Sequence, residues 1–196
     1  MDAPPDHLTI GGADYPIATD FRVWLAIGER VNDLYAQPRS RGDALSNLRT
    51  ICDMEALAFG GVLEDEDPYQ CLAAMLAFLR GYPEPPIEGT PEEKAPVYSF
   101  DYDLNYIVLA IRNQGGPDLS YRRRGPFHWW EFLLEFRSLC GDHYILRLMD
   151  IRGYEDDAGK DAHREAMRLK RRYALPPEMT ADQRRAAEEF EKMTGG

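Results

Sequence analysis

The stretch "GPFHWWEFLLEF", residues 125–136, restricts the fold more than any other part of the chain. As a helix it would carry two apolar stripes, because neighbouring positions on an α-helix point about 100° apart. A helix that is apolar around so much of its circumference is buried on more than one side. One stripe therefore belongs to the core, and the second packs against another helix of the chain or meets a partner. The two stripes are Phe127, Trp130, Leu133 and Leu134, and Trp129, Phe132 and Phe136.

The second stripe supplies candidate partner-binding residues, since tryptophan is enriched in interface hot spots. The arginine run just before the helix is a further candidate contact, although short charge runs are usually solvated loops. His128 and Glu131 could share a helical face as a base and its orienting partner. The simpler interpretation is a part-buried histidine that satisfies a nearby helix end. The candidate partner-binding residues are Trp129, Phe132, Phe136, Arg122, Arg123 and Arg124.

Apolar periodicity along the rest of the chain predicts a mainly α protein, a multi-helix bundle with a small N-terminal β-hairpin. The hairpin turns at Gly11-Gly12, and Thr19 or Asp20 caps the helix that follows it. We expect "VYSFDYD" (97–103) to be a short extended piece. Further helices are expected at 43–59, 68–81, 106–111, 142–154, 158–174 and 180–193.

An acidic run, Glu64 to Asp67, precedes the expected helix that begins at Pro68. Carboxylates at this place satisfy the free N–H groups of a helix start and its dipole. We therefore interpret the run as a helix cap rather than as a cation site.

Five prolines in residues 82–96 mark the clearest linker. It separates an N-terminal part, residues 1–81, with the hairpin and its helices, from a C-terminal helical part, residues 97–177. Residues 178–196 form a polar C-terminal helix or tail.

The formal net charge of −11 is unevenly placed. Residues 1–100 hold 17 acidic and seven basic residues, whereas residues 101–196 hold 17 and 16. This balance argues against a general binder of the phosphate backbone. It favours solubility and a basic or apolar protein partner.

Three cysteines, Cys52, Cys71 and Cys140, lie far apart in helical contexts, where a free thiol behaves as a small buried hydrophobe. Their odd number indicates a reducing compartment. The N-terminus has neither the basic nor the apolar region of a secretory signal, and no apolar run is long enough to span a membrane. We expect a cytoplasmic protein.

The sequence offers little catalytic chemistry. Cys140 and His143 have a C-x-x-H spacing, but a zinc site needs three or four ligands in a compact set. Common phosphate-binding, dinucleotide-binding, zinc-protease and serine-hydrolase motifs are missing from the sequence. We expect no enzyme activity, no metal and no cofactor.

Four blocks and the segment that ends the pattern resemble the phage gene-product-fifteen family in order and spacing over about residues 8–177. The tryptophan pair is the most specific element. The chain departs from the family pattern in its proline-rich linker and in its arginine run. The segments are "YPIATDFRVWL" (15–25), "YSFDYDLNYI" (98–107), "HWWEFLLEF" (128–136), "DIRGY" (150–154) and "KRRYALP" (170–176).

The resemblance implies a tail-assembly chaperone or accessory protein of long-tailed phages, which works in the host cytoplasm. Its expected partner is the tape-measure protein, kept soluble before the tail tube polymerises; the tail-tube protein or another tail chaperone are further partners. A long, helical, aggregation-prone client suits an acidic helical protein that binds helices in a groove. The alternatives are a structural tail component and a small nucleic-acid-binding regulator that uses Arg122 to Arg124 and the basic helix 160–172. Neither a membrane nor, in the leading hypothesis, nucleic acid is an expected partner.

Overall fold

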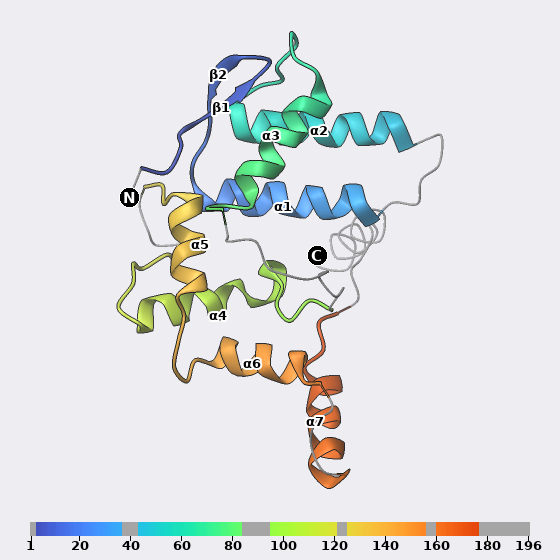
Figure 1. Ribbon diagram of the computed structural model, residues 1–196, viewed down its shortest axis with the longest axis vertical. Helices are drawn as coiled ribbons and strands as arrows, with labels where there is room; N and C mark the ends of the chain where they lie inside the picture. Colours follow the sequence, from blue (N-terminus) through green and yellow to red (C-terminus); the bar gives the residue numbers. More distant parts are fainter. Residues whose placement is uncertain (1–2, 37–42, 84–94, 121–124, 156–159, 177–196) are drawn as a thin grey trace, which may run out of the picture. The chain divides into compact units, whose positions relative to one another are not determined.

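The computed structural model describes residues 3–36, 43–83, 95–120, 125–155 and 160–176 (Figure 1). These residues form seven α-helices and one two-stranded antiparallel hairpin, which confirms the mainly α prediction. The expected C-terminal helix, most of the predicted linker and Arg122 to Arg124 lie outside the described residues.

Two compact units divide the described chain. The N-terminal unit contains residues up to 83 together with 126–131. The C-terminal unit contains, among the described residues, 95–120, Gly125, 132–155 and 160–176. The sequence predicts that residues 97–177 form one part. In the structure, residues 126–131, which include both Trp129 and Trp130, belong instead to the N-terminal unit.

The hairpin of the N-terminal unit pairs β1 (His7–Ile10) with β2 (Ala13–Pro16), with His7 opposite Pro16. Gly11 and Gly12 form the turn with φ values of +58° and +90°. A two-residue turn of this kind needs positive φ at both positions, which glycine adopts without strain. A Cβ on Gly11 would also lie 2.5 Å from Oε2 of Glu66. The turn therefore needs glycine at both positions on conformational grounds, and a side chain at Gly11 would in addition make the end of the Glu66 side chain move.

Helices α1 (Phe21–Ala36), α2 (Asp43–Phe59) and α3 (Pro68–Leu79) complete most of the N-terminal unit. α1 and α2 lie side by side in opposite directions, and α3 packs on α2 (Figure 1). Asp20 caps α1, because its Oδ1 accepts the backbone N–H of Arg22 at 2.9 Å. The helix presents one buried stripe to the core. That stripe is Phe21, Trp24, Ile27 and Val31.

The acidic run before α3 acts as the predicted cap. Oδ1 of Asp67 accepts the backbone N–H groups of Tyr69, at 2.7 Å, and of Gln70, at 3.3 Å. Glu66 accepts the hydroxyl of Tyr15 at 2.7 Å and so connects this loop to the hairpin. Two of the four carboxylates thus have defined structural partners.

The C-terminal unit contains α4 (Phe100–Asn113), α6 (Tyr144–Gly153), α7 (Lys160–Arg172) and most of α5 (Trp129–Arg137). α4 and α6 lie side by side, and α7 follows α6 (Figure 1). The prediction of an extended piece at 97–103 is wrong from Phe100 onward. Ser99 is extended and caps α4: its Oγ accepts the N–H of Asp101, and Asp103 accepts the N–H of Ser99.

Candidate functional site

His128 lies at the start of α5, where its ring satisfies backbone groups on two sides. Its Nδ1 accepts the N–H of Trp130 at 3.0 Å, and its Nε2 lies 3.0 Å from the carbonyl oxygen of Pro5. Because a carbonyl only accepts, Nε2 must carry the proton, and the ring is the neutral tautomer. Both nitrogens are therefore engaged, which confirms the helix-end interpretation of this residue.

The adjacent tryptophans satisfy the far end of α3. The indole Nε1–H of Trp129 donates to the carbonyl of Leu79 at 3.0 Å, and that of Trp130 donates to the carbonyl of Phe78 at 2.8 Å. The last four carbonyls of a helix have no partner within the helix, and here the N–H of Gly81 also donates to the carbonyl of Phe78, at 3.0 Å. Two side chains that point about 100° apart can reach two successive carbonyls. The tryptophan pair is thus a helix C-cap built from a distant segment.

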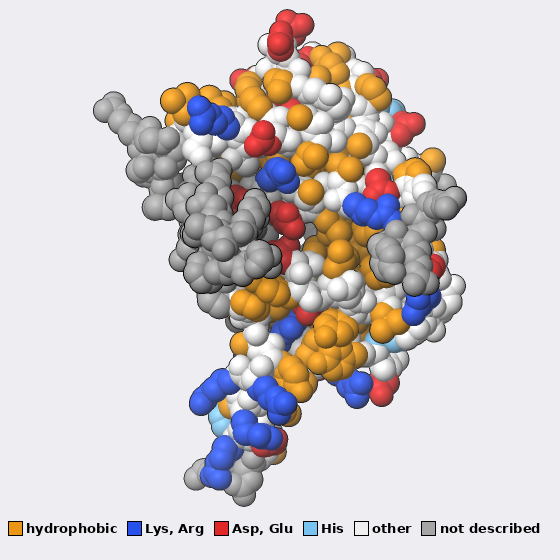
Figure 2. Space-filling model, turned by 180° about the vertical axis from the view of Figure 1, so that it is seen from behind, with side chains coloured by type: hydrophobic (Ala, Val, Ile, Leu, Met, Phe, Trp, Pro, Cys, Tyr) orange, Lys and Arg blue, Asp and Glu red, His pale blue; other side chains and the backbone are white. Residues whose placement is uncertain are grey.

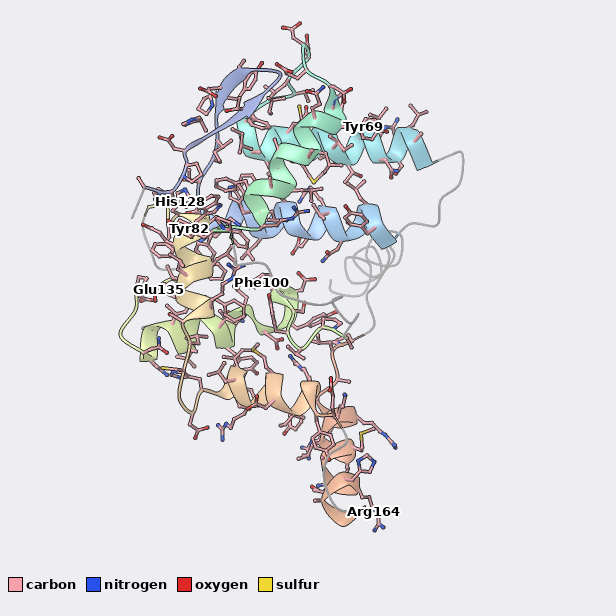
Figure 3. The ribbon with its side chains drawn as sticks, in the orientation of Figure 1. Tyr69, Tyr82, Phe100, His128, Glu135 and Arg164 are labelled. Carbon is pink, nitrogen blue, oxygen red and sulfur yellow. The ribbon has the colours of Figure 1, made fainter. Side chains whose placement is uncertain are left out.

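Aromatic packing adds to this cap within the N-terminal unit. The ring of Trp130 lies 5.4 Å from that of Phe78 and 4.7 Å from that of Tyr82. The ring of His128, labelled near the start of α5 in Figure 3, lies 5.8 Å from that of Phe78. Trp129 is only 3% exposed, so its side chain presents almost no surface to a partner.

The other two aromatic candidates are buried in the C-terminal unit. The ring of Phe100 at the start of α4 lies 5.8 Å from Phe132 and 5.7 Å from Phe136 (Figure 3). Tyr98 packs edge-on against Phe136 at 4.9 Å. All three aromatic candidates therefore serve as core residues here, and Arg122 to Arg124 lie outside the described residues.

A buried ion pair organises the C-terminal unit. The guanidinium of Arg152 on α6 contacts both carboxylate oxygens of Asp103 on α4, at 2.6 and 3.2 Å. It also donates to the carbonyls of Val97, at 3.0 Å, and Tyr173, at 2.8 Å. The second, fourth and fifth sequence segments that resemble the phage family supply Asp103, Arg152 and Tyr173. These three residues form a network in which the buried guanidinium has hydrogen-bond acceptors, as expected for a charge that lies away from water.

Among the described residues, no group of three or more His, Cys, Asp or Glu side chains could hold a metal ion. Cys71 is buried, Cys52 is half-buried and Cys140 is exposed. The prediction of a buried thiol is therefore wrong for Cys140, which lies in the turn that Gly141 allows after α5. Burial raises the pKa of the Cys71 thiol to about 12, with a further contribution from the Glu55 carboxylate beside it.

The exposed aromatic residues of the C-terminal unit gather on α4 and α6. Tyr102, Tyr106 and Leu109 follow one another at helical spacing on α4 and are 42–47% exposed. Tyr144 on α6 packs edge-on against Tyr106 with ring centroids 4.9 Å apart. We call these four residues the α4–α6 surface. The opposite side of α4 is buried through Ile107, Ala110 and Ile111.

The α4–α6 surface was not predicted from the sequence. The signal was present, because positions 102, 106 and 109 have the i, i+4, i+7 spacing of one helix face. An extended piece over 97–103 places Tyr102 outside the helix and breaks that spacing. The surface can bind apolar or aromatic side chains, and it carries no arrangement that indicates bond-breaking chemistry.

No helix among the described residues has the length and apolar character that crossing a membrane requires. Searches of curated proteins and of solved structures found no match to this chain. A comparison with protein families matched residues 2–175 to the Bacteriophage Gp15 protein family. The match covers nearly the whole chain and includes every described helix. The chain therefore belongs to the Bacteriophage Gp15 protein family.

Proposed function

We propose that this protein is a tail-assembly chaperone that binds the tape-measure protein before the tail tube polymerises. The observation that carries the proposal is the α4–α6 surface, which leaves three tyrosines and a leucine exposed on one helix pair. Tyrosine has a large, rigid apolar ring and a polar hydroxyl. It therefore suits a surface that is exposed to water in the free protein and contributes binding energy in a complex. Membership of a bacteriophage protein family also supports a role in phage assembly.

The proposed mode of binding is a helix of the client laid along α4. Tyr102 and Leu109 are seven residues apart, which corresponds to about 10 Å along the helix axis. This length accommodates two turns of an amphipathic helix, whose apolar side chains recur at the same interval. Tyr144 widens the contact from one helix to two. Affinity should therefore come mainly from aromatic and aliphatic contact.

The acidic character of the chain supports a chaperone role in a second way. A net charge of −11 keeps a complex dispersed by repulsion between copies while the apolar contact is occupied. It also attracts basic segments of a client during encounter, so association should slow modestly as salt increases.

Co-expression with the tape-measure protein of the same phage tests the proposal. We expect the client to be soluble only when this chain is present and to elute with it as one complex. An insoluble client in both cases, with no complex recovered, would refute the chaperone function.

A structural tail component is the second candidate, since it too would bind tail proteins. Mass analysis of purified virions separates the two functions. A chaperone is absent from the finished particle, whereas a tail component is present in a fixed ratio to the tube protein.

A further inference from the structure

Helix α7 carries a concentrated basic face in an otherwise acidic chain. Residues 160–172 contain six basic and two acidic residues, a net charge of +4. Since the whole chain has a net charge of −11, the remaining residues carry −15. Lys and Arg side chains crowd along this helix in Figure 2. The charge separation makes α7 the clearest site for an acidic ligand among the described residues.

Helical geometry places three arginines on one exposed stripe. Arg164, Arg168 and Arg171 occupy positions i, i+4 and i+7, which fall within about 60° of one another around the helix axis. All three are exposed, and Figure 3 shows Arg164 near the N-terminal end of α7. Ala166 and Leu169 are half-buried on a different side of the helix.

Contacts on the other side of α7 attach it to its own unit. Lys170 donates to the carbonyl of Tyr154 at 2.8 Å, and Arg152 donates to the carbonyl of Tyr173 just after the helix. The helix is therefore held by one side, and the arginine stripe is presented on another.

The stripe already binds a carboxylate in the geometry that a ligand would use. Arg168 contacts Glu165 through two nearly parallel hydrogen bonds, at 2.8 and 2.6 Å. Such bidentate pairing is the preferred recognition of a carboxylate by a guanidinium. The pair is solvent-exposed, so it contributes little stability and can exchange for a carboxylate of a partner.

Nucleic acid and membrane fit the stripe less well than protein does. Three arginines would neutralise only about three phosphates, while the remaining negative charge of the chain repels the backbone. A membrane-bound helix needs a broad apolar face with large side chains. The described apolar residues of α7 are only two alanines, a methionine and a leucine.

We propose that the arginine stripe of α7 docks an acidic helix of a protein partner, whose carboxylates recur at the same i, i+4, i+7 spacing. This inference does not rest on the proposed chaperone function. It uses a different surface, and its test needs no tape-measure protein.

A labelled helical peptide of about 20 residues, with glutamates along one face, is the direct probe. We expect the full-length protein to bind it, and to bind a glutamine-substituted peptide at least about tenfold more weakly. The triple variant Arg164→Gln/Arg168→Gln/Arg171→Gln should lose about tenfold in affinity for the acidic peptide. Its helix content, measured by circular dichroism, should match that of the unmodified protein.

Three further variants separate the stripe from general charge. The matched control Arg49→Gln/Arg112→Gln/Arg147→Gln removes the same charge from exposed positions elsewhere and should bind within about twofold of the unmodified protein. The triple Arg→Lys variant of the stripe keeps the charge and should bind more weakly than the parent but better than the glutamine variant. Glu165→Gln releases Arg168 from its internal carboxylate and should strengthen binding.

Several results would overturn the inference. Equal affinity for the acidic and glutamine peptides would show that the stripe does not recognise carboxylates. Equal losses in the stripe and control variants would attribute binding to net charge alone. A third such result is that a DNA duplex or anionic lipid vesicles bind more tightly than the peptide and lose that binding in the stripe variant. That result would show that the partner is not an acidic protein helix.

Discussion

Replacing Arg152 with methionine should strongly destabilise the C-terminal unit. The side chain of Arg152 is 9% exposed and that of Asp103 is 2% exposed, so the pair lies almost wholly out of water. Methionine preserves much of the stem volume but none of the four hydrogen bonds. Asp103 would retain the Ser99 N–H as a donor, and its charge would have no compensating partner. The substitution therefore isolates the electrostatic and hydrogen-bonding loss.

The expected cost follows from that burial. Removing one partner of a buried ion pair typically costs about 3–5 kcal/mol, mostly because the other charge is left uncompensated. We expect the lower half of this range, since Val97 and Tyr173 are only half-buried and water can replace the donor to their carbonyls. The double variant Asp103→Leu/Arg152→Met removes both charges and should recover at least about 1–2 kcal/mol relative to Arg152→Met alone.

Urea unfolding followed by circular dichroism measures these free energies. The three tryptophans all belong to the N-terminal unit, so their emission reports whether that unit stays folded in each variant. A loss below about 1 kcal/mol for Arg152→Met would refute the reasoning, because it would mean that the pair is effectively solvated. A double variant less stable than the single one would also contradict it.

Three further predictions concern Trp130, the cysteines and His128. Trp130→Phe should cost no more than about 1 kcal/mol in the free energy of unfolding, because the carbonyl of Phe78 loses its indole donor but keeps the N–H of Gly81, while most of the ring packing remains. At pH 8, Cys140 should react with a maleimide much faster than Cys71, whose raised pKa and burial keep the thiol protonated and inaccessible; mass analysis of partly labelled protein measures the order. His128→Asn should retain more thermal stability than His128→Leu, since asparagine can still accept the Trp130 N–H.

Local patterns were enough to predict most of the fold. Gly11-Gly12 allows a tight hairpin turn because glycine adopts positive φ without strain. Asp67, ahead of Pro68, caps a helix by accepting backbone N–H groups only two and three residues away. Interactions of this kind depend on neighbouring residues, so a single sequence contains the information. The same reasoning failed at 97–103, where aromatic residues favour a strand by propensity but the Ser99 cap and the Asp103 network favour a helix.

The roles of the tryptophan pair could not be obtained in this way. The indole of Trp129 reaches a carbonyl 50 residues away, and Arg152 reaches a carboxylate 49 residues away. Helical periodicity indicates that such residues are buried, but it does not say which backbone groups they satisfy. The sequence left two roles open for the second stripe of residues 125–136, packing inside the chain or contact with a partner; the structure buries Trp129, Phe132 and Phe136 and leaves the tyrosines of α4 exposed.

Binding of the tape-measure protein by the α4–α6 surface is tested most directly by capture with matched tyrosine variants. Tyr102→Lys/Tyr106→Lys places two charges on the proposed surface, while Tyr35→Lys/Tyr69→Lys places two charges on exposed tyrosines of the N-terminal unit. Each tagged variant is co-expressed with the tape-measure protein, and the captured client is quantified. We predict that the first variant loses most of the client and that the second captures as much as the unmodified protein. Full capture by the Tyr102→Lys/Tyr106→Lys variant, with its helix content intact, would contradict the central claim.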